Sequence, residues 1–518
     1  MGAASEAEAS AEAVPADFKI SAVCGINKGK LMKYVIALDA GTTSVRAFLF
    51  DADTGKLVHG VQQEVAQSFP KPGWVEQDAN EIYYKAVYAL NECVRFAGDE
   101  PVAGIGIANQ RETVVLWDVR TGEPIAPAVV WQCRRTSDYC AGLSDDTKSL
   151  IRNRTGLIPD AYFSASKIRW LLKNVPEANR LLKEGNLRAG TIDCYLVNKL
   201  TKGKTFATDY TNACRTMLFD IRKLCWDGEI ARRLEVPLEI LPEARPSDAL
   251  MGEAVIGGKH IPISGVLGDQ QAALFGQGCL KEGEGKITYG TGLFLLFNTG
   301  EKCVASERGV LTTIGYSLSG KTVYALEGSA FNAGSSVQWL RDGLGLIETS
   351  AESERLAESV SDCGGVCFVP ALTGLGAPYW NSDARGLLSG ITRSTTRAHI
   401  VRAVLESIAY SARDLTDCMQ ADSGICLRQL KCDGGASANN FLMGFQSDVL
   451  GVSIDRPVER ESTALGAALM CAVSRELVSL DEVRALRKTE RLFTPSDDRA
   501  YFDKLFADYR RAVQRSLL

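Results

Sequence analysis

The sequence predicts an α/β protein with the two lobes of an ATPase, and two observations indicate this fold class. A strand, a turn rich in Gly and Thr, and a second strand occur twice, over residues 34–50 and residues 287–297, once in each half of the chain. Other apolar stretches end at a carboxylate or at glycines and continue into a helical pattern, as at Asp269 and at Asp433. Open α/β sheets bind ligands at such strand ends.

The first hairpin runs from the strand Tyr34 to Asp39 through Gly41-Thr42-Thr43-Ser44 into the strand Val45 to Phe50. A glycine lets a ligand approach the backbone closely, and turn N–H groups and hydroxyls can donate to phosphate oxygens. A plain hairpin without a ligand satisfies the same pattern equally well.

The second hairpin runs from Ile287-Thr288-Tyr289 through Gly290-Thr291-Gly292 into the strand Leu293 to Phe297. Two copies in one chain, with Asp39 ending the first strand, favour the paired phosphate hairpins of a two-lobed ATPase.

Asp269 follows the apolar run Ile261 to Leu267 and opens the helical stretch Gln271 to Gly276. A single Asp at this position is more often a helix N-cap than a catalytic group. The accompanying hairpins favour a role in chemistry at the sheet edge.

A third motif places Asp433-Gly434-Gly435 and Asn439 between the strand Leu430 to Cys432 and the helical stretch Phe441 to Leu450. Glycines at this position leave room for a nucleotide against a helix N-terminus, and the Asn439 amide can hydrogen-bond the nucleotide.

Composition excludes several other classes. The 518 residues are 46% apolar and carry a net charge of -5 that is spread along the chain, which favours neither a nucleic-acid surface nor a membrane span. Fifteen cysteines without a CxxC pair and only three histidines argue against a disulfide framework or a zinc site.

The two ends of the sequence differ from the rest of the chain. Residues 1–16 are rich in Ala, Glu and Ser without signal-peptide features, and we expect residues 1–32 to be a disordered extension. The terminal Ser516-Leu517-Leu518 is similar to a peroxisomal signal but lacks its basic middle residue. We therefore expect a cytoplasmic protein, with the glycosome or peroxisome as the alternative.

Several segments resemble the glycerol kinases, and the resemblance runs without large gaps from about Lys33 to the C-terminus. These segments are Leu38–Ser44, Pro70–Glu76, Asn109–Thr113, Val130–Thr136, Thr208–Ala213, Gly268–Gln271, Gly374–Trp380 and Asp433–Ala436. The Asn109–Glu112 and Trp131–Thr136 segments distinguish glycerol kinases from their sugar-kinase relatives.

The resemblance implies two ribonuclease-H-like domains of the actin-like ATPase superfamily, each with a mixed central sheet. We place them at residues 33–279 and 280–518, with the active-site cleft between them and no assigned role for residues 1–32. It further implies Mg²⁺-dependent transfer of the ATP γ-phosphoryl group to glycerol, giving sn-glycerol 3-phosphate and ADP, by a homodimer or homotetramer.

The resemblance also implies roles for individual residues. Asp269 would be the general base, and Asp39 with Asp269 would hold Mg²⁺. The residues implied around the nucleotide are Thr42, Thr43, Ser44, Arg46, Gly290, Thr291, Gly334, Gln338, Gly435 and Asn439.

Glycerol would be recognised by polar groups and by an aromatic wall. The residues implied are Arg111, Glu112, Trp131, Tyr162, Asp269, Gln270 and Phe294. From spacing alone, Arg111 and Glu112 are more often a surface ion pair, and each aromatic residue is more often core.

Two alternatives stay open at this point. Another carbohydrate kinase, such as a pentulose or gluconate kinase, has the same fold but lacks the Arg111-Glu112 and Trp131 segments. A nucleotide-gated binding or chaperone ATPase has the same hairpins but does not need Asp269 beside a polyol pocket.

Overall fold

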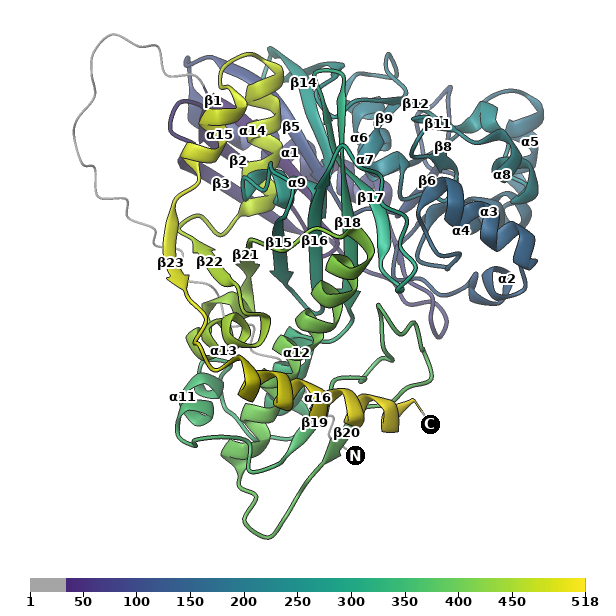
Figure 1. Cartoon of the computed structure of the whole chain (residues 1–518). Coiled ribbons are helices and arrows are strands. Elements are labelled where there is room, and N and C mark those ends of the chain that lie inside the picture. Colours follow the sequence, from purple (N-terminus) through teal and green to yellow (C-terminus); the bar gives the residue numbers. More distant parts are fainter. Residues whose placement is uncertain (1–33, 518) are drawn as a thin grey trace, which may run out of the picture.

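The computed structural model describes residues 34–517, so the predicted extension over residues 1–32 and the terminal Leu518 lie outside the described residues. Two large mixed sheets organise this part of the chain (Figure 1). The first has six strands, in the spatial order β13 (Leu250–Ile256), β14 (Lys259–Gly268), β5 (Val102–Asn109), β1 (Tyr34–Ala40), β2 (Ser44–Asp51) and β3 (Leu57–Glu64).

The second sheet has seven strands. Their order is β17 (Leu311–Leu318), β18 (Lys321–Ala330), β16 (Leu293–Gly300), β15 (Glu284–Tyr289), β21 (Gln429–Gly434), β22 (Ser453–Pro457) and β23 (Thr489–Phe493). These two sheets confirm the predicted fold class.

Both sheets are built around a hairpin that was predicted from the sequence. Strand β1 pairs antiparallel with β2 and parallel with β5, and β14 extends the parallel part. In the second sheet β15 pairs antiparallel with β16 and parallel with β21, and β22 extends the parallel part. The two halves of the chain therefore share one strand arrangement, which brings equivalent strand ends to equivalent edges.

Helices cover both faces of the first sheet. Successive side chains of β1 point to opposite faces, so they contact different helices. Ile36 and Leu38 pack against α1 (Ala79–Ala97), whereas Val35 and Ala37 belong to the core that includes α14 (Ser462–Ser474). Helix α14 comes from the C-terminal half, so the two halves share a helical layer. The predicted boundary between residues 279 and 280 stays a prediction.

Helix α9 (Asp269–Gly276) crosses α14 at very close range. A Cβ atom on Gly466 would lie 1.8 Å from the Ala272 carbonyl oxygen, and one on Gly276 would lie 2.2 Å from the Ser462 carbonyl oxygen. Only glycine fits at both positions. Because α9 also contacts β14 of the first sheet and β15 to β17 of the second, its first residue is held firmly between the sheets.

The second sheet packs its other face on the C-terminal helices. The core here combines α12 (Arg397–Ser423), α13 (Asn440–Leu450) and α16 (Arg499–Ser516) with the strands β15, β16 and β18. The start of α13 agrees with the predicted helical stretch from Phe441.

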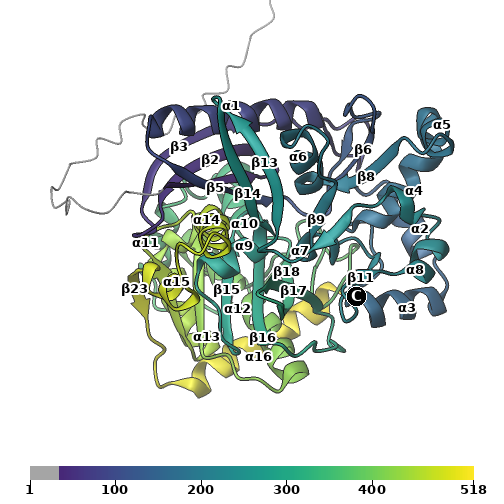
Figure 2. The same ribbon diagram turned by 90° about the horizontal axis from the view of Figure 1, so that it is seen from above.

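A smaller four-stranded sheet extends the first half to one side (Figure 2). Its strands are β4 (Glu76–Gln77), β7 (Ala128–Val129), β6 (Val114–Asp118) and β8 (Leu187–Thr191). The helices on this side are α2 (Ser137–Ala141), α3 (Asp145–Thr155), α4 (Ser164–Asn174), α5 (Pro176–Lys183) and α8 (Gly228–Arg233). Between residues 34 and 517, no helix is long and apolar enough to cross a lipid bilayer.

Candidate active site

Two neighbouring parallel strands bring Asp269 and Arg111 together. Gly268 ends β14 opposite Asn109, which ends β5, so the residues after both strands meet at one sheet edge. The Arg111 Nε lies 3.2 Å from Asp269 Oδ1. Asp269 is the first residue of α9, and Gly268 is the N-cap, so Asp269 does not cap this helix.

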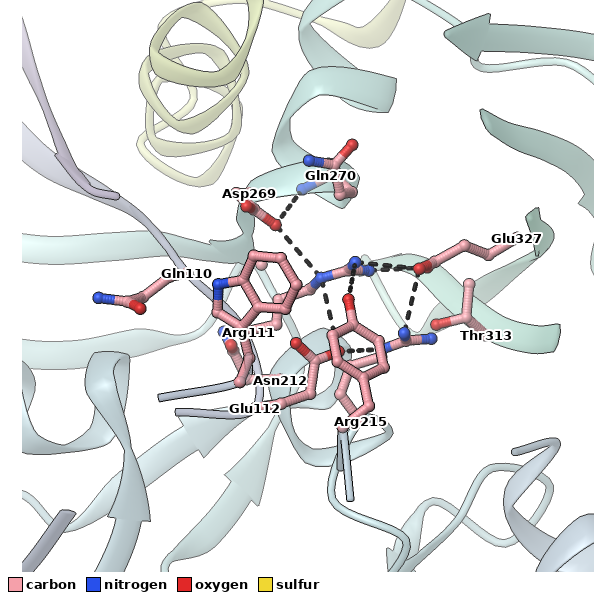
Figure 3. A network of polar contacts seen from close by, with 12 residues as sticks. Gln110, Arg111, Glu112, Asn212, Arg215, Asp269, Gln270, Thr313 and Glu327 are labelled. Carbon is pink, nitrogen blue, oxygen red and sulfur yellow. Dashed lines mark hydrogen bonds and ion pairs between the residues drawn. The ribbon is translucent and has the colours of Figure 1, made fainter. Parts of the chain in front are cut away.

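Arg111 also connects to the second sheet (Figure 3). Its Nη1 and Nη2 donate to the two carboxylate oxygens of Glu327 at 2.7 and 3.0 Å, which is a bidentate pair. Glu327 lies on β18 and is 1% exposed, and Arg111 is 3% exposed. The surface ion pair that spacing alone favours for Arg111 and Glu112 is therefore wrong, since both residues are buried.

Arg215 completes a buried network of two cations and two anions. Its Nε donates to Glu112 Oε1 at 2.7 Å, and its Nη2 donates to Glu327 Oε1 at 3.0 Å. The sequence did not reveal Arg215 or Glu327. The signal available for Glu327 was a single carboxylate inside a strand whose other charged residue, Lys321, is its first residue.

The network fixes the charge state of Glu327. Although burial opposes ionisation, Arg111 and Arg215 together lower the pKa of the Glu327 carboxyl to about 2. Burial raises the pKa of Glu112, and the two arginines only partly offset this effect. Glu327 therefore serves as the fixed counter-charge of the two arginines.

Glu112 adopts a backbone conformation that is rare for a residue with a side chain. Its φ is 60°, and the Thr113 N–H donates to the Arg111 carbonyl oxygen at 2.7 Å. This three-residue turn is strained and persists only when its surroundings hold it. The strain lies at the position that presents the predicted acceptor-binding carboxylate.

Three half-buried aromatic side chains line the same region. The Trp131 ring lies edge-on to Tyr162, with centroids 5.5 Å apart, and edge-on to Phe294, with centroids 6.5 Å apart. The Tyr162 hydroxyl lies 3.4 Å from Arg111 Nη2. The structure thus brings together the predicted aromatic wall, although Phe294 comes from the second sheet.

Gln270 connects Asp269 to a buried lysine. The Gln270 N–H donates to Asp269 Oδ1 at 2.7 Å, and its side-chain oxygen accepts from Lys286 Nζ. Lys286 also donates to Thr288 Oγ1 at 2.9 Å. Burial lowers the pKa of Lys286 to about 8, while the carboxylates of Asp433 and Asp269 oppose this shift. The sequence patterns did not predict Lys286 as a site residue.

Asp39 lies at the end of β1 and is 2% exposed. Arg46 donates to its Oδ2 at 2.5 Å and to Glu461 Oε2 at 2.6 Å. Burial raises the pKa of Asp39 while Arg46 lowers it, and the charge of Asp269 also raises it, so the two predicted metal-binding carboxylates influence each other. Such a pair suits Mg²⁺, which prefers one or two carboxylates with phosphates and waters.

Within the described residues, no three or more His, Cys, Asp or Glu side chains are arranged to coordinate a metal ion. The residues present fit a cation that is bound mainly by oxygen ligands from outside the protein.

A cavity of about 440 Å³ opens beside the second hairpin. Six of the predicted nucleotide-binding residues line it, namely Gly290, Thr291, Gly334, Gln338, Gly435 and Asn439. Glycine is required at Gly334, where a Cβ would lie 2.5 Å from the Gly290 carbonyl oxygen, and the Gly334 N–H donates to that oxygen at 3.1 Å. Helix α10 (Gly334–Gln338) therefore packs directly on the turn.

The other predicted nucleotide residues, Thr42, Thr43, Ser44 and Arg46, belong to the first hairpin and do not line this cavity. The Thr42 hydroxyl accepts from Trp131 Nε1 at 3.0 Å, which connects this hairpin to the aromatic wall. Asn439 is the N-cap of α13, because its side-chain oxygen accepts from the Leu442 N–H at 2.9 Å.

Comparison with known protein families matches both halves of the chain. The model of the FGGY family of carbohydrate kinases, N-terminal domain, matches residues 34–276, and the C-terminal domain model matches residues 285–475. A glycerol kinase of Treponema denticola is 51% identical over 494 residues, which cover 94% of this chain and 99% of the relative. A glycerol kinase of Symbiobacterium thermophilum is 52% identical over 500 residues, with 95% and 99% covered.

Solved structures show the same arrangement. The crystal structure of Plasmodium falciparum glycerol kinase with ADP has a TM-score of 0.88 at 38% identity and covers 94% of this chain and 99% of that chain. A ligand-bound xylulose kinase from Lactobacillus acidophilus has a TM-score of 0.85 at 20% identity, with 94% and 98% covered, which shows a shared fold alone.

Proposed function

The chain belongs to the FGGY family of carbohydrate kinases, and we propose that it is an ATP-dependent glycerol kinase. It transfers the γ-phosphoryl group of ATP to a terminal hydroxyl of glycerol and releases sn-glycerol 3-phosphate and ADP. The observation that carries the proposal is the buried Arg111-Glu112 pair, held by Arg215 and Glu327 beside Asp269. The relatives named glycerol kinase, 51% and 52% identical over nearly the whole chain, support it.

Glycerol is a short, uncharged triol, so its binding site must supply both donors and acceptors close to a small apolar surface. Arg111 donates, Glu112 accepts, and Tyr162 can do either. The half-buried rings of Trp131 and Phe294 contact the carbon chain. Since Glu327 and Arg215 already balance the charges of this pair, an uncharged acceptor is bound without a new unpaired charge.

Asp269 acts as the general base. One of its oxygens is occupied by Arg111 and by the Gln270 N–H, and within the described residues no hydrogen bond or ion pair reaches Oδ2. The free oxygen accepts the proton of the glycerol hydroxyl as that oxygen bonds to the γ-phosphorus and ADP leaves with the bridging oxygen. The hydrogen bonds to Oδ1 hold the carboxylate while this occurs.

The nucleotide is bound by both hairpins. The adenosine end occupies the cavity lined by Gly334, Gln338, Gly435 and Asn439, and the phosphates extend toward the turns at Thr42 and Thr291. Asp39 and Asp269 would hold Mg²⁺, directly or through water, and the ion would supply positive charge to neutralise the phosphate oxygens.

Two further properties are proposed from the sequence. The chain assembles as a homodimer or homotetramer, as the resemblance implies. It resides in the cytoplasm, because its cysteines suit a reducing compartment. The glycosome or peroxisome is the alternative.

A coupled assay for ADP release tests the reaction and the substrate together. The purified chain is given ATP and Mg²⁺ with glycerol, xylulose, gluconate or no acceptor. We expect turnover that depends on glycerol and a far lower rate with the other acceptors. A preference for xylulose or gluconate would favour a different carbohydrate kinase, and ADP release without an acceptor would favour a nucleotide-gated ATPase.

A further inference from the structure

Lys167 is a completely buried lysine at the start of α4, beside the proposed glycerol site. Its relative exposure is 0%, and its Nζ donates to backbone carbonyl oxygens. These oxygens belong to Tyr162, to Phe163 at 3.1 Å and, in a longer contact, to Glu112 at 3.4 Å. An ammonium has three N–H donors, so all three are directed at the backbone around the site.

The burial of this cation is unfavourable for the fold. Among residues 34–517, no carboxylate forms an ion pair with Lys167, and a cation in the first turn of a helix opposes the helix dipole. Burial lowers the pKa of Lys167 to about 7; the carboxylates of Glu112 and Asp160 oppose the shift, and Arg134 adds to it. A buried charge without a counter-charge needs a reason other than stability.

We propose that Lys167 is a positioning residue for the phosphoryl acceptor, which it serves by fixing the backbone of Glu112 and Tyr162. Both residues present side chains to the proposed glycerol site, from segments 50 positions apart in the sequence. Lys167 joins the two segments through a single nitrogen atom. The inference rests on the proposed function.

The conformation of Glu112 explains why its backbone needs a clamp. With φ of 60°, the turn is strained, and it is held by donors to its carbonyl group. Ser164 Oγ donates to the Glu112 carbonyl oxygen at 3.2 Å, so α4 supplies two donors to this oxygen. Without Lys167, we expect the turn to relax and the Glu112 carboxylate to move away from its productive position, and small displacements are costly in such sites.

The effect should be confined to the acceptor. The nucleotide cavity is lined by residues of the second half, from Tyr289 to Leu442, and none of the three carbonyl groups that bind Lys167 belongs to it. Lys167→Met keeps the length of the side chain and removes its donors. We expect this variant to raise the KM for glycerol by about 10-fold and to leave the KM for ATP within about twofold of wild type.

The chain provides a matched control in Lys431. This lysine is 7% exposed and its Nζ donates to the carbonyl oxygens of Gln277 at 2.8 Å and Gly278 at 3.2 Å. Lys431→Met also removes hydrogen bonds from a lysine to backbone carbonyl oxygens, but these carbonyl groups do not belong to the residues of the acceptor site. We expect it to lower the melting temperature but to leave the KM for glycerol within about twofold of wild type.

Both variants are measured as the full chain, with circular dichroism and thermal melting to confirm folding. A folded Lys167→Met protein with an unchanged KM for glycerol would overturn the proposal, and so would an equal rise in Lys431→Met or an equal rise in the KM for ATP. If Lys167→Met does not fold, Ser164→Ala removes the other donor to the Glu112 carbonyl. Its KM for glycerol should rise by about two- to fivefold, and no rise would overturn the proposal.

The same experiment separates this inference from the proposed function. A wild-type chain that does not phosphorylate glycerol would contradict the proposed function itself. A wild-type chain that does so, with a Lys167→Met variant that binds glycerol equally well, would contradict only the role of Lys167.

Discussion

Replacing Glu327 with Gln tests whether the buried counter-charge holds Arg111 and Arg215 in place. The ordinary pKa of a Glu carboxyl is 4.5, and in the folded chain that of Glu327 is about 2. Since one pKa unit corresponds to about 1.4 kcal/mol and the group is fully buried, the ionised carboxylate contributes about 3 kcal/mol to stability at pH 7. Glu327→Gln removes this contribution while it keeps the size of the side chain.

The pH dependence has a definite sign. A carboxyl whose pKa is lowered by folding stabilises the protein above its unfolded pKa, and this stabilisation is lost as the pH falls through the folded pKa. The wild-type chain should therefore lose stability from this group between pH 4.5 and about pH 2. In Glu327→Gln that contribution is absent throughout, so the two proteins should differ most at neutral pH.

Thermal melting monitored by circular dichroism, over a series of pH values, measures this difference. At pH 7 we expect a melting temperature lower by about 3 °C, together with a higher KM for glycerol because the Gln amide keeps one acceptor oxygen, so Arg111 loses one bond of its bidentate pair. The control is Glu406→Gln, which changes a buried carboxylate that pairs with Arg402 at 2.8 Å outside the site. Burial raises the pKa of Glu406, so its ionised form contributes less.

Two outcomes would refute the reasoning. One is a Glu327→Gln protein that melts within about 1 °C of wild type at pH 7. The other is a loss in Glu406→Gln as large as that in Glu327→Gln, with an unchanged KM for glycerol in both. Either result would mean that the buried network does not depend on the charge of Glu327.

Three further predictions concern other parts of the chain. Asp269→Asn should lower kcat by about 10² to 10⁴ because the general base is lost, while nucleotide affinity measured by calorimetry should change little; wild-type turnover would contradict the assignment. Gly466→Ala should destabilise the fold by about 1 to 3 kcal/mol, because its Cβ would lie 1.8 Å from the Ala272 carbonyl oxygen, and kcat should fall because α9 carries Asp269; an unchanged melting temperature and kcat would be inconsistent with the close crossing. Folding lowers the pKa of Lys167 from 10.5 to about 7, so its protonation opposes folding below about pH 7 and this penalty decreases as the pH rises toward 10.5. Between pH 7 and pH 9, wild type should gain about 2 to 3 kcal/mol relative to Lys167→Met, as denaturant unfolding can measure; parallel stability profiles for the two proteins would contradict this.

Local sequence patterns were sufficient for the secondary structure around the site. The strands on both sides of each Gly/Thr turn, the strand before Asp269 and the helix after Asn439 were predicted from apolar runs bounded by turn residues. These features depend on nearest neighbours along the chain. The crossing of α9 and α14 was not predicted, because nothing in the local pattern shows which distant backbone approaches Gly466.

Some features of the site also follow from local sequence, whereas others depend on contacts between distant segments. Motifs identified Arg111, Glu112 and Asp269 as candidate residues, but spacing alone placed the first two on the surface. Arg215 and Glu327 lie 103 and 216 positions from their partners Glu112 and Arg111, so only the folded chain shows that they are partners. Lys286 and Lys167 were also not predicted, since a lysine in a strand or a helix carries no sign of its burial.

By itself, the sequence determined the fold class, the two hairpins and the chemical identity of the groups that can bind phosphate and a polyol. The tertiary structure decided which charges are buried together and which backbone groups hold them. The physical reason is that ionisation and hydrogen bonding depend on distance and solvent exposure, which β18 and α4 set for Arg111 and Glu112 from far along the chain. The sequence supplies the chemical groups of the site, and tertiary packing sets their charge states and positions.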